Sequence, residues 1–166
     1  MPTAKSLRKE LVSYLKSKGI DCHVPVKRDN IVYIDQYQTG SFYFDMGTFV
    51  VFENDGWKSS TVTIATTGNV KVASSNVKPQ VLEAIQQQNE SSLSQFYLVG
   101  NAVMGKLTTQ VQPGSVGERC WAGATLLASE AESFLMDIEE LLDPASYQTE
   151  LSEADQQALE DAVLNM

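Results

Sequence analysis

Apolar residues recur at helical spacing from Gly117 to Leu142, and this is the most regular pattern in the chain. One row consists of Trp121, Ala124, Ala128, Ala131, Leu135, Ile138 and Leu142. A second row beside it consists of Leu127, Phe134 and Leu141. Because two adjacent apolar rows make a wide face, the spacing predicts one long helix lying across a large, flat surface. The opposite side is acidic and is expected to face water, with Glu118, Glu130, Glu132, Asp137, Glu139 and Glu140.

Two shorter helices are predicted by the same spacing. The first runs from an N-cap at Thr3 to a stop at Gly19, and its apolar face holds Leu7, Leu11, Tyr14 and Leu15. The second opens near Asn76 with Pro79 in its first turn. Its apolar stripe consists of Val77, Val81, Leu82 and Ile85. Ser115 and Glu118 have the spacing of a capping box at the start of the long helix.

The segments between these helices are typical of strands. Strands are predicted at residues 31–37, 42–52, 61–66 and 70–73, and a hairpin at residues 96–99 and 102–111 turns at Gly100-Asn101. Strands joined by such short turns must be antiparallel. We therefore predict an α+β fold with one mainly antiparallel sheet, whose N-terminal, middle and long C-terminal helices pack largely on one face.

The length of 166 residues favours one domain, predicted at residues 1–144, followed by an acidic and partly helical tail at residues 145–166. Ser152 is placed to cap a helix in this tail, which would pack on its own chain or become ordered against a partner. No apolar run approaches the roughly 20 residues of a membrane span, and the first 15 residues lack a signal-peptide pattern. A cytoplasmic protein with reduced thiols is therefore expected, since its two cysteines, Cys22 and Cys120, have no paired-motif spacing.

The net charge of −9 is unevenly distributed along the chain. The first 28 residues are basic, whereas Arg119 is the single basic residue after Gly117. A strongly acidic protein repels a polyanion, so general nucleic-acid binding is disfavoured. The basic first helix either faces solvent and pairs with acidic neighbours, or offers a face on which an acidic partner docks.

The sequence contains no recognisable catalytic set. His23 is the only histidine and neighbours Cys22, but adjacent side chains seldom bind one metal ion, and structural zinc needs four well-placed ligands. A thiol enzyme would require Cys120 to reach His23 in space, and a helix N-terminus would lower the pKa of the Cys120 thiol. A small, partly buried side chain is the simpler interpretation of Cys120. No catalytic, cofactor or metal residues are therefore assigned, and a non-enzymatic protein is predicted.

The run LEAIQQQNESSLSQFYLVGNAVMGKLTTQV, from Leu82 to Val111, resembles the bacterial sensory-transduction-regulator (YbjN-like) domains. These domains resemble type III secretion chaperones in fold. The shared pattern is a helix ending near an asparagine, here Asn89, then a polar link, a hairpin and a closing helix. The resemblance implies a non-enzymatic domain that holds another polypeptide over its sheet and first helix. It also implies a homodimer through the helix that carries Val81, Leu82 and Ile85.

These observations predict a cytoplasmic, homodimeric, protein-binding or chaperone-like regulatory module with an unidentified protein or peptide partner, and with no nucleic-acid or membrane partner. A small-ligand-binding sheet domain is the alternative, because many aromatic residues lie among the predicted strands. That alternative requires an enclosed apolar cavity. A thiol enzyme is the third hypothesis, and it requires His23 to lie beside the thiol of Cys120.

Overall fold

The computed structural model describes residues 3–35, 44, 46–52, 61–147 and 151–165. Its helices are α1 (Ala4–Ser17), α3 (Lys78–Ser91), α4 (Val116–Asp137) and α5 (Glu153–Leu164), with single 3-10 turns η2 (Ser75–Val77), η3 (Glu139–Leu141) and η4 (Pro144–Ser146). Its strands are β1 (Cys22–His23), β2 (Ile31–Ile34), β3 (Thr48–Phe52), β4 (Thr61–Thr66), β5 (Gln95–Val99) and β6 (Ala102–Gln110).

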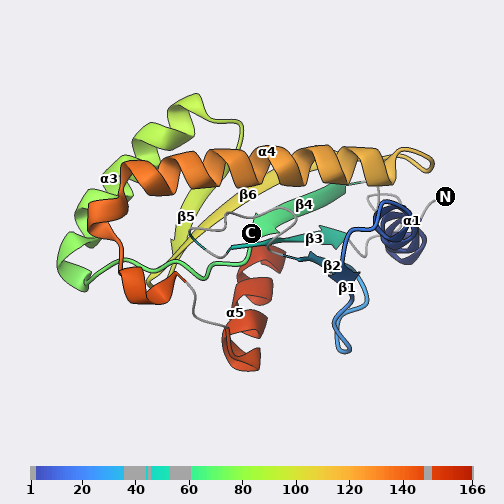
Figure 1. Ribbon diagram of the computed structural model, residues 1–166, viewed down its shortest axis with the longest axis horizontal. Coiled ribbons are helices and arrows are strands. Elements are labelled where there is room, and N and C mark those ends of the chain that lie inside the picture. Colours follow the sequence, from blue (N-terminus) through green and yellow to red (C-terminus); the bar gives the residue numbers. More distant parts are fainter. Residues whose placement is uncertain (1–2, 36–43, 45, 53–60, 148–150, 166) are drawn as a thin grey trace.

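The strands form one six-stranded sheet in the order β1-β2-β3-β4-β6-β5, and every neighbouring pair is antiparallel. Three helices lie against one face of the sheet, which we call the inner face. Along it, α4 crosses the strands, α1 crosses the start of α4, and α3 lies at the opposite end beside β5 (Figure 1). The predicted α+β fold with a mainly antiparallel sheet is confirmed.

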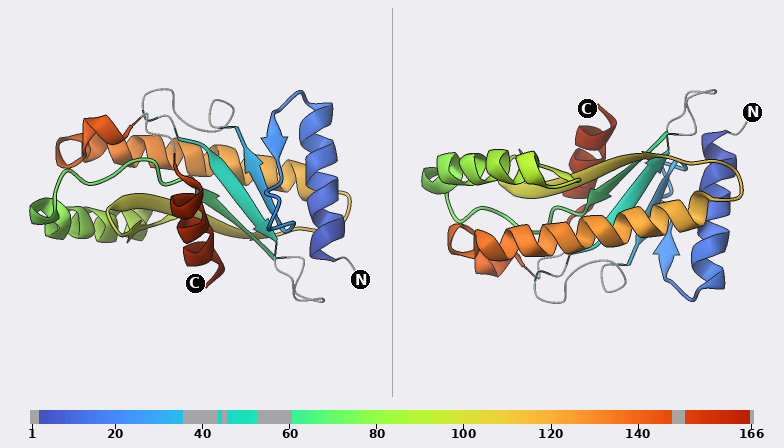
Figure 2. Two further views of the ribbon diagram at one scale, coloured as in Figure 1. Left: turned by 90° about the horizontal axis from the view of Figure 1, so that it is seen from below. Right: turned by 90° about the horizontal axis from the view of Figure 1, so that it is seen from above.

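The tail is helical and packs on the other face of the sheet. Figure 2 shows α5 on the side of the sheet opposite α4, running across the strands. Ser152 caps this helix as predicted, because its hydroxyl accepts a hydrogen bond of 3.1 Å from the backbone N–H of Asp155. The chain therefore places a helical layer on each side of the sheet.

The long helix is shorter than the apolar pattern predicts. It ends at Asp137 instead of Leu142, and the chain continues through Ile138 into η3. The last turn of α4 has no basic residue, and Asp137, Glu139 and Glu140 place negative charge at the helix end, which the helix dipole disfavours. The apolar row nevertheless stays buried, because Ile138 is 5% and Leu142 3% exposed.

The start of α4 is capped by a residue distant in sequence. Ser115 makes no side-chain cap, so the predicted capping box with Glu118 is not formed. Instead the backbone N–H groups of Gly114 and Val116 donate hydrogen bonds of 2.9 to 3.1 Å to the carboxylate of Glu10 in α1. A carboxylate satisfies the unpaired N–H groups of a helix N-terminus and complements its dipole, so this contact fixes α1 to α4.

Three predicted strands differ from the structure. The strand predicted at residues 31–37 is described as β2 over four residues, and the one predicted at 42–52 appears as β3 from Thr48; residues 36–43 and 45 lie outside the described residues. Residues 70–73 form isolated bridges instead of a strand, pairing Lys71 with Ala102 and Val72 with Leu142. The second bridge ties the end of the α4 segment to the β layer.

Small residues allow α4 to approach its neighbours closely, as its alanine-rich first half predicts. A Cβ atom at Gly117 would lie 2.1 Å from Cγ of Tyr14 in α1. A Cβ atom at Gly123 would lie 2.5 Å from Cδ1 of Ile64 in β4. Both distances are far below van der Waals contact, so α4 is seated on α1 and on the sheet at glycine positions.

Gly117→Ala is expected to destabilise the fold by about 1–3 kcal/mol, because the added methyl group overlaps Cβ and Cγ of Tyr14, which move only if α1 itself shifts. Gly123→Ala is the matched comparison. Its methyl group meets the flexible end of Ile64, and alanine gains about 1 kcal/mol in helix propensity over glycine. Urea unfolding should therefore show a larger loss for Gly117→Ala. Equal or greater stability of that variant would contradict the close contact.

Candidate protein-binding surfaces

The sheet has apolar residues on both faces. In β2, Val32 and Ile34 belong to the inner core under α1 and α4. Their neighbours on the strand point the other way, since side chains alternate along a strand. The outer core consists of Ile31, Tyr33, Phe49, Val51, Ala65 and Met104 from the sheet, together with Leu159 and Val163 from α5. The outer face is therefore an apolar surface that needs a cover.

Three rings stack across the first three strands on this outer face. The ring of His23 stacks on Tyr33 with centroids 5.1 Å apart, and Tyr33 stacks on Phe49 at 5.1 Å. These residues are direct partners in the strand register. Cross-strand aromatic pairs of this kind stabilise a sheet. His23 is thus the exposed end of an aromatic row, and the sole histidine has a structural contact there.

α5 covers the outer face through one apolar pair and one ionic contact. Leu159 and Val163, four positions apart, are 5% and 6% exposed. Leu159 fills the space beside Gly68, where a Cβ atom would lie 3.1 Å from Cδ1 of the leucine. The guanidinium group of Arg28 hydrogen-bonds to the carboxylate of Asp161, and its Nε lies 3.9 Å from Oε1 of Glu160.

The polar groups under α5 are incompletely satisfied. Burial raises the pKa of Glu160 above its ordinary value of 4.5, while the charge of Arg28 acts in the opposite direction. The hydroxyl of Tyr33 is buried beside Gln156 and Glu160, and burial raises its pKa. Among the described residues, no neighbour of this hydroxyl has the geometry of a well-directed hydrogen bond. The interface of α5 thus contains a buried carboxylate and a buried hydroxyl that a better-matched helix would satisfy.

A groove of about 320 Å³ runs beside α5. One wall consists of His23 at the end of β1 and of the connection between β1 and β2, with Val26 and Arg28. The other wall is α5 itself, with Glu153, Gln156 and Glu160. Val26 is fully exposed at this connection. The groove is open and of mixed polarity, so it extends the α5 interface and does not form an enclosed pocket.

The first helix carries a cationic stripe. One side of α1 carries Lys5, Arg8, Lys9 and Lys16. Helical spacing places these four side chains within about a quarter of a turn around the helix axis. The three lysines are exposed and Arg8 is half-buried. Within the described residues, none of the four forms a salt bridge, and Nε of Arg8 is buried without a hydrogen-bond partner. We call these four residues the cationic stripe.

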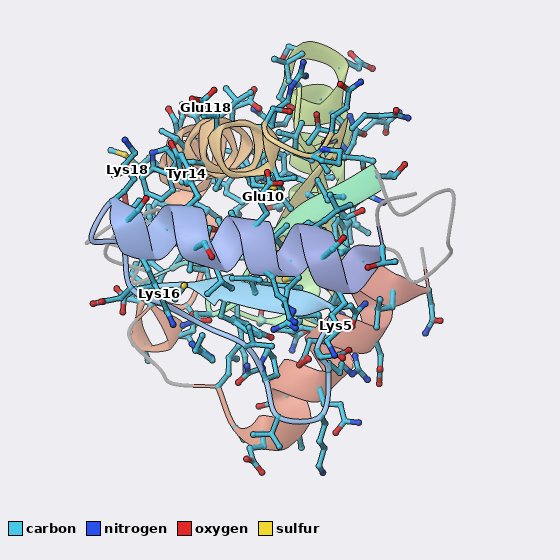
Figure 3. The ribbon with its side chains drawn as sticks, turned by 90° about the vertical axis from the view of Figure 1, so that its right-hand side faces the viewer. Lys5, Glu10, Tyr14, Lys16, Lys18 and Glu118 are labelled. Atoms are coloured by element: carbon cyan, nitrogen blue, oxygen red, sulfur yellow. The ribbon has the colours of Figure 1, made fainter. Side chains whose placement is uncertain are left out.

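The other side of α1 is occupied by contacts with α4. In Figure 3, Tyr14, Lys18 and Glu10 lie on the side of α1 that faces α4, whereas Lys5 and Lys16 lie on the opposite side. The ammonium group of Lys18 sits 5.8 Å from the centroid of the Tyr14 ring, a cation–π contact. The cationic stripe is therefore separate from the surface that holds α1 in place.

The thiol and the imidazole lie on different sides of the sheet. Cys120 is fully buried in the inner core beneath α1, whereas His23 stacks on Tyr33, which belongs to the outer core. Burial, with a smaller contribution from the charge of Glu10, raises the pKa of the Cys120 thiol to about 12. Desolvation thus outweighs the helix N-terminus, and the thiol is not activated as a nucleophile.

The remaining candidates for chemistry are sparse. Among the residues that the structure describes, no three His, Cys, Asp or Glu side chains gather as they would around a metal ion. No described helix is long and apolar enough to cross a membrane. The layer between α4 and the sheet is filled by buried residues such as Ile64 and Leu127, and Gly123 lies against Ile64 there, so this layer offers no support for a ligand cavity.

The predicted dimer helix is mostly used within the chain. Val81 and Ile85 pack into the core cluster that α3 shares with the second half of α4, while Leu82 is 52% exposed. Leu93, just after α3, is 72% exposed. Of the three residues assigned to the dimer contact, Leu82 is the one available to a second chain. Dimerisation through α3 stays a prediction.

Several structural roles were missed from the sequence. Glu130, expected to face water, accepts hydrogen bonds of 2.6 to 3.1 Å from Leu93 and Ser94 and thereby closes the link between α3 and β5. Glu10 caps α4, and Arg28 anchors α5. For the contact between Arg28 and α5, the sequence offered one signal. It was the aliphatic pair in the tail, with acidic residues between the two aliphatic residues.

An antiparallel sheet with α1, α3 and α4 on one face and a closing hairpin before the long helix defines an α+β fold of the YbjN class. No protein-family model matches the sequence, and no curated protein matches it. Among solved structures, the chain is similar to the crystal structure of "YbjN, a putative transcription regulator from E. coli", with a TM-score of 0.57. The match has 12% sequence identity and covers 86% of this chain and 96% of that chain. The resemblance in fold inferred from Leu82 to Val111 is thus confirmed.

Replacing Glu160 tests its buried environment. A carboxyl group whose pKa is raised in the folded state stabilises the fold most at low pH, where it is protonated. This contribution is lost as pH rises from the ordinary pKa of 4.5 through the raised pKa. Glu160→Gln mimics the protonated form. The variant should therefore be more stable than the wild-type chain at pH 7, and the difference should shrink towards pH 4.5. Thermal unfolding at several pH values measures this.

Asp161→Asn is the matched control, because Asp161 is exposed and bound to Arg28. This variant should be no more stable than the wild-type chain at pH 7. If Glu160→Gln lowers stability at pH 7, the attraction of Arg28 outweighs the cost of burying the carboxylate.

The two thiols should differ in their reaction with iodoacetamide at pH 8. Burial raises the pKa of both, but Cys22 is half-buried and Cys120 is enclosed. Mass spectrometry should find Cys22 modified first and Cys120 modified only as fast as the chain opens. Rapid labelling of Cys120 in the folded chain would instead support the thiol-enzyme hypothesis.

Proposed function

We propose that this chain is a non-enzymatic, protein-binding regulatory module whose cationic stripe on α1 docks an acidic segment of a partner protein. The observation that carries the proposal is the stripe itself: four cations that form no salt bridge among the described residues, on a chain of net charge −9. Val12 lies within the stripe and is half-buried, so the surface combines charge with an apolar contact.

Charge complementarity identifies the kind of partner. An acidic segment gains attraction from the stripe, and such attraction chiefly increases the association rate and selects against basic partners. A nucleic acid offers negative charge as well, but the summed field of the chain repels a long polyanion. A short acidic segment of a protein carries less charge than a long polyanion and is repelled less by that field.

The lack of an activated group in the described part of the chain supports a non-enzymatic role. The Cys120 thiol is buried on the inner side of the sheet, and the imidazole of His23 is stacked on the outer side. General acid–base or nucleophilic catalysis needs its groups within hydrogen-bond reach of each other or of a substrate. The YbjN protein is described as a "putative transcription regulator". For this chain, we propose regulation through protein contact, by a homodimer in the cytoplasm.

Charge reversal on α1 tests the proposal. The probe is a fluorescent polyglutamate peptide, compared with a DNA duplex of similar total charge, in anisotropy titrations at low salt. The double variant Lys9→Glu, Lys16→Glu should bind the peptide at least tenfold more weakly than the wild-type chain, because it removes two cations and adds two anions. Raising the salt concentration should weaken wild-type binding, since exposed charges are screened.

Lys18→Glu, Lys71→Glu is the matched control, with the same change in charge away from the stripe. It should lose less than threefold, with circular dichroism confirming the fold of both variants. Equal losses would show a response to net charge alone and would overturn the stripe as a site. Tighter binding of the DNA duplex than of the peptide would overturn the proposal of a protein partner.

A further inference from the structure

We infer that the outer face of the sheet is a second protein-binding site, which takes a short acidic amphipathic helix of a partner protein in exchange for α5. This surface is distinct from the cationic stripe, and the inference does not rest on the function proposed for α1. It rests on what α5 covers, how α5 is held, and which groups it leaves unsatisfied.

The covered surface is continuous and apolar. Ile31, Tyr33, Phe49 and Val51 come from two adjacent strands, and all are less than 10% exposed with α5 in place. Ala65 and Met104 extend the same surface across the next two strands of the sheet. An uncovered apolar patch of this kind on a soluble domain marks a site of protein interaction. The occupant seen here is a helix, so the face has the shape that a helix requires.

The contacts of α5 define the chemistry of the partner. Two aliphatic side chains four positions apart, Leu159 and Val163, lie on the face, as helical spacing allows. The acidic residues at positions 160 and 161 reach Arg28 at its edge. A partner helix of the same class would carry the pattern aliphatic-acidic-acidic-any-aliphatic. Arg28 supplies the charge that selects an acidic helix over a neutral one.

α5 is held less firmly than α4, the long helix of the inner face. It buries Leu159, Glu160 and Val163, whereas α4 buries ten residues. One of its three buried residues is a carboxylate with a raised pKa, and the buried hydroxyl of Tyr33 lies beside Gln156 and Glu160 without a well-directed hydrogen bond to any described residue. A buried polar group without a partner costs about 1–3 kcal/mol. A helix that satisfies Tyr33 and keeps the aliphatic pair would compete with α5.

Exchange is measured with the full chain and a defined probe. The probe is a fluorescent peptide with the sequence of residues 151–165. The receptor is the chain carrying Leu159→Asp and Val163→Asp, which should detach α5 and leave the inner core unchanged. The peptide should bind this opened chain at least tenfold more tightly than the wild-type chain, where the tethered α5 competes at an effective concentration in the millimolar range.

A charge exchange separates specific docking from general apolar adhesion. Arg28→Glu in the opened chain should weaken peptide binding several-fold. A peptide with Glu160→Lys and Asp161→Lys should restore it, and should bind the opened chain with native Arg28 poorly. A peptide that carries Leu159→Asp should not bind. Equal affinity of wild-type and opened chains, or no restoration by the exchanged charges, would overturn the inference.

Hydrogen exchange on the wild-type chain gives a second test that needs no substitution. Backbone amides of α5 should exchange at least a hundredfold faster than those in the middle of α4, because α5 leaves the sheet without global unfolding. Equal protection of the two helices would overturn the inference. Light scattering gives another outcome that would overturn the inference. If the wild-type chain is a dimer and the peptide dissociates it, the occupant of the outer face is α5 of a second copy.

Discussion

The structure depends on the close contact of α4 with two surfaces at once. Gly117 lies against Tyr14 of α1, and Gly123 lies against Ile64 of β4, at distances that leave no room for a side chain. Glu10 then closes the corner by accepting hydrogen bonds from the backbone at the start of α4. Packing fixes the distance between the two helices. The carboxylate of Glu10 fixes the direction of one helix relative to the other. Because interiors are close-packed, α1, α4 and the sheet behave as one rigid unit.

The sheet in that unit is apolar on both faces. Strands with apolar residues at successive positions, as in β2 and β3, leave the outer face with Tyr33, Phe49 and Val51 to bury. Such strands are typical of sheets that are covered on both faces. The inner face is covered by three helices and the outer face by α5 from the tail. The sheet thus creates a requirement that the chain meets with α5, the shortest of the described α-helices.

The local patterns in the sequence predicted most of the fold because they depend on neighbouring residues. The hairpin at Gly100-Asn101, the caps at Thr3 and Ser152, and the apolar rows of α4 are of this kind. The missed features involve residues far apart in the chain. Glu10 is 104 positions from Gly114, Glu130 is 36 from Ser94, and Arg28 is 133 from Asp161. In sequence these carboxylates look like any solvated acidic residue.

The candidate surfaces were predicted to different extents for the same reason. The basic character of α1 is a local property, and the sequence revealed it. The separation of that helix into a stripe and a side facing α4 depends on where α4 crosses it, which helical spacing alone does not give. Prediction of the outer face as a binding surface required both the strand register and the position of the tail. Its aromatic row across His23, Tyr33 and Phe49 exists only because the register aligns them.

The distribution of charge links the two surfaces. Among the cations of the first 28 residues, Arg28 binds the acidic helix α5, whereas the cationic stripe has no salt bridge among the described residues. The chain itself therefore shows what one part of its basic region binds. An acidic helix with aliphatic residues is the ligand seated beside Arg28, and the stripe on α1 presents the same charge without such a ligand. A surface patch whose charge is opposite to the net charge of the chain favours partners that the rest of the molecule would repel. This contrast gives selectivity.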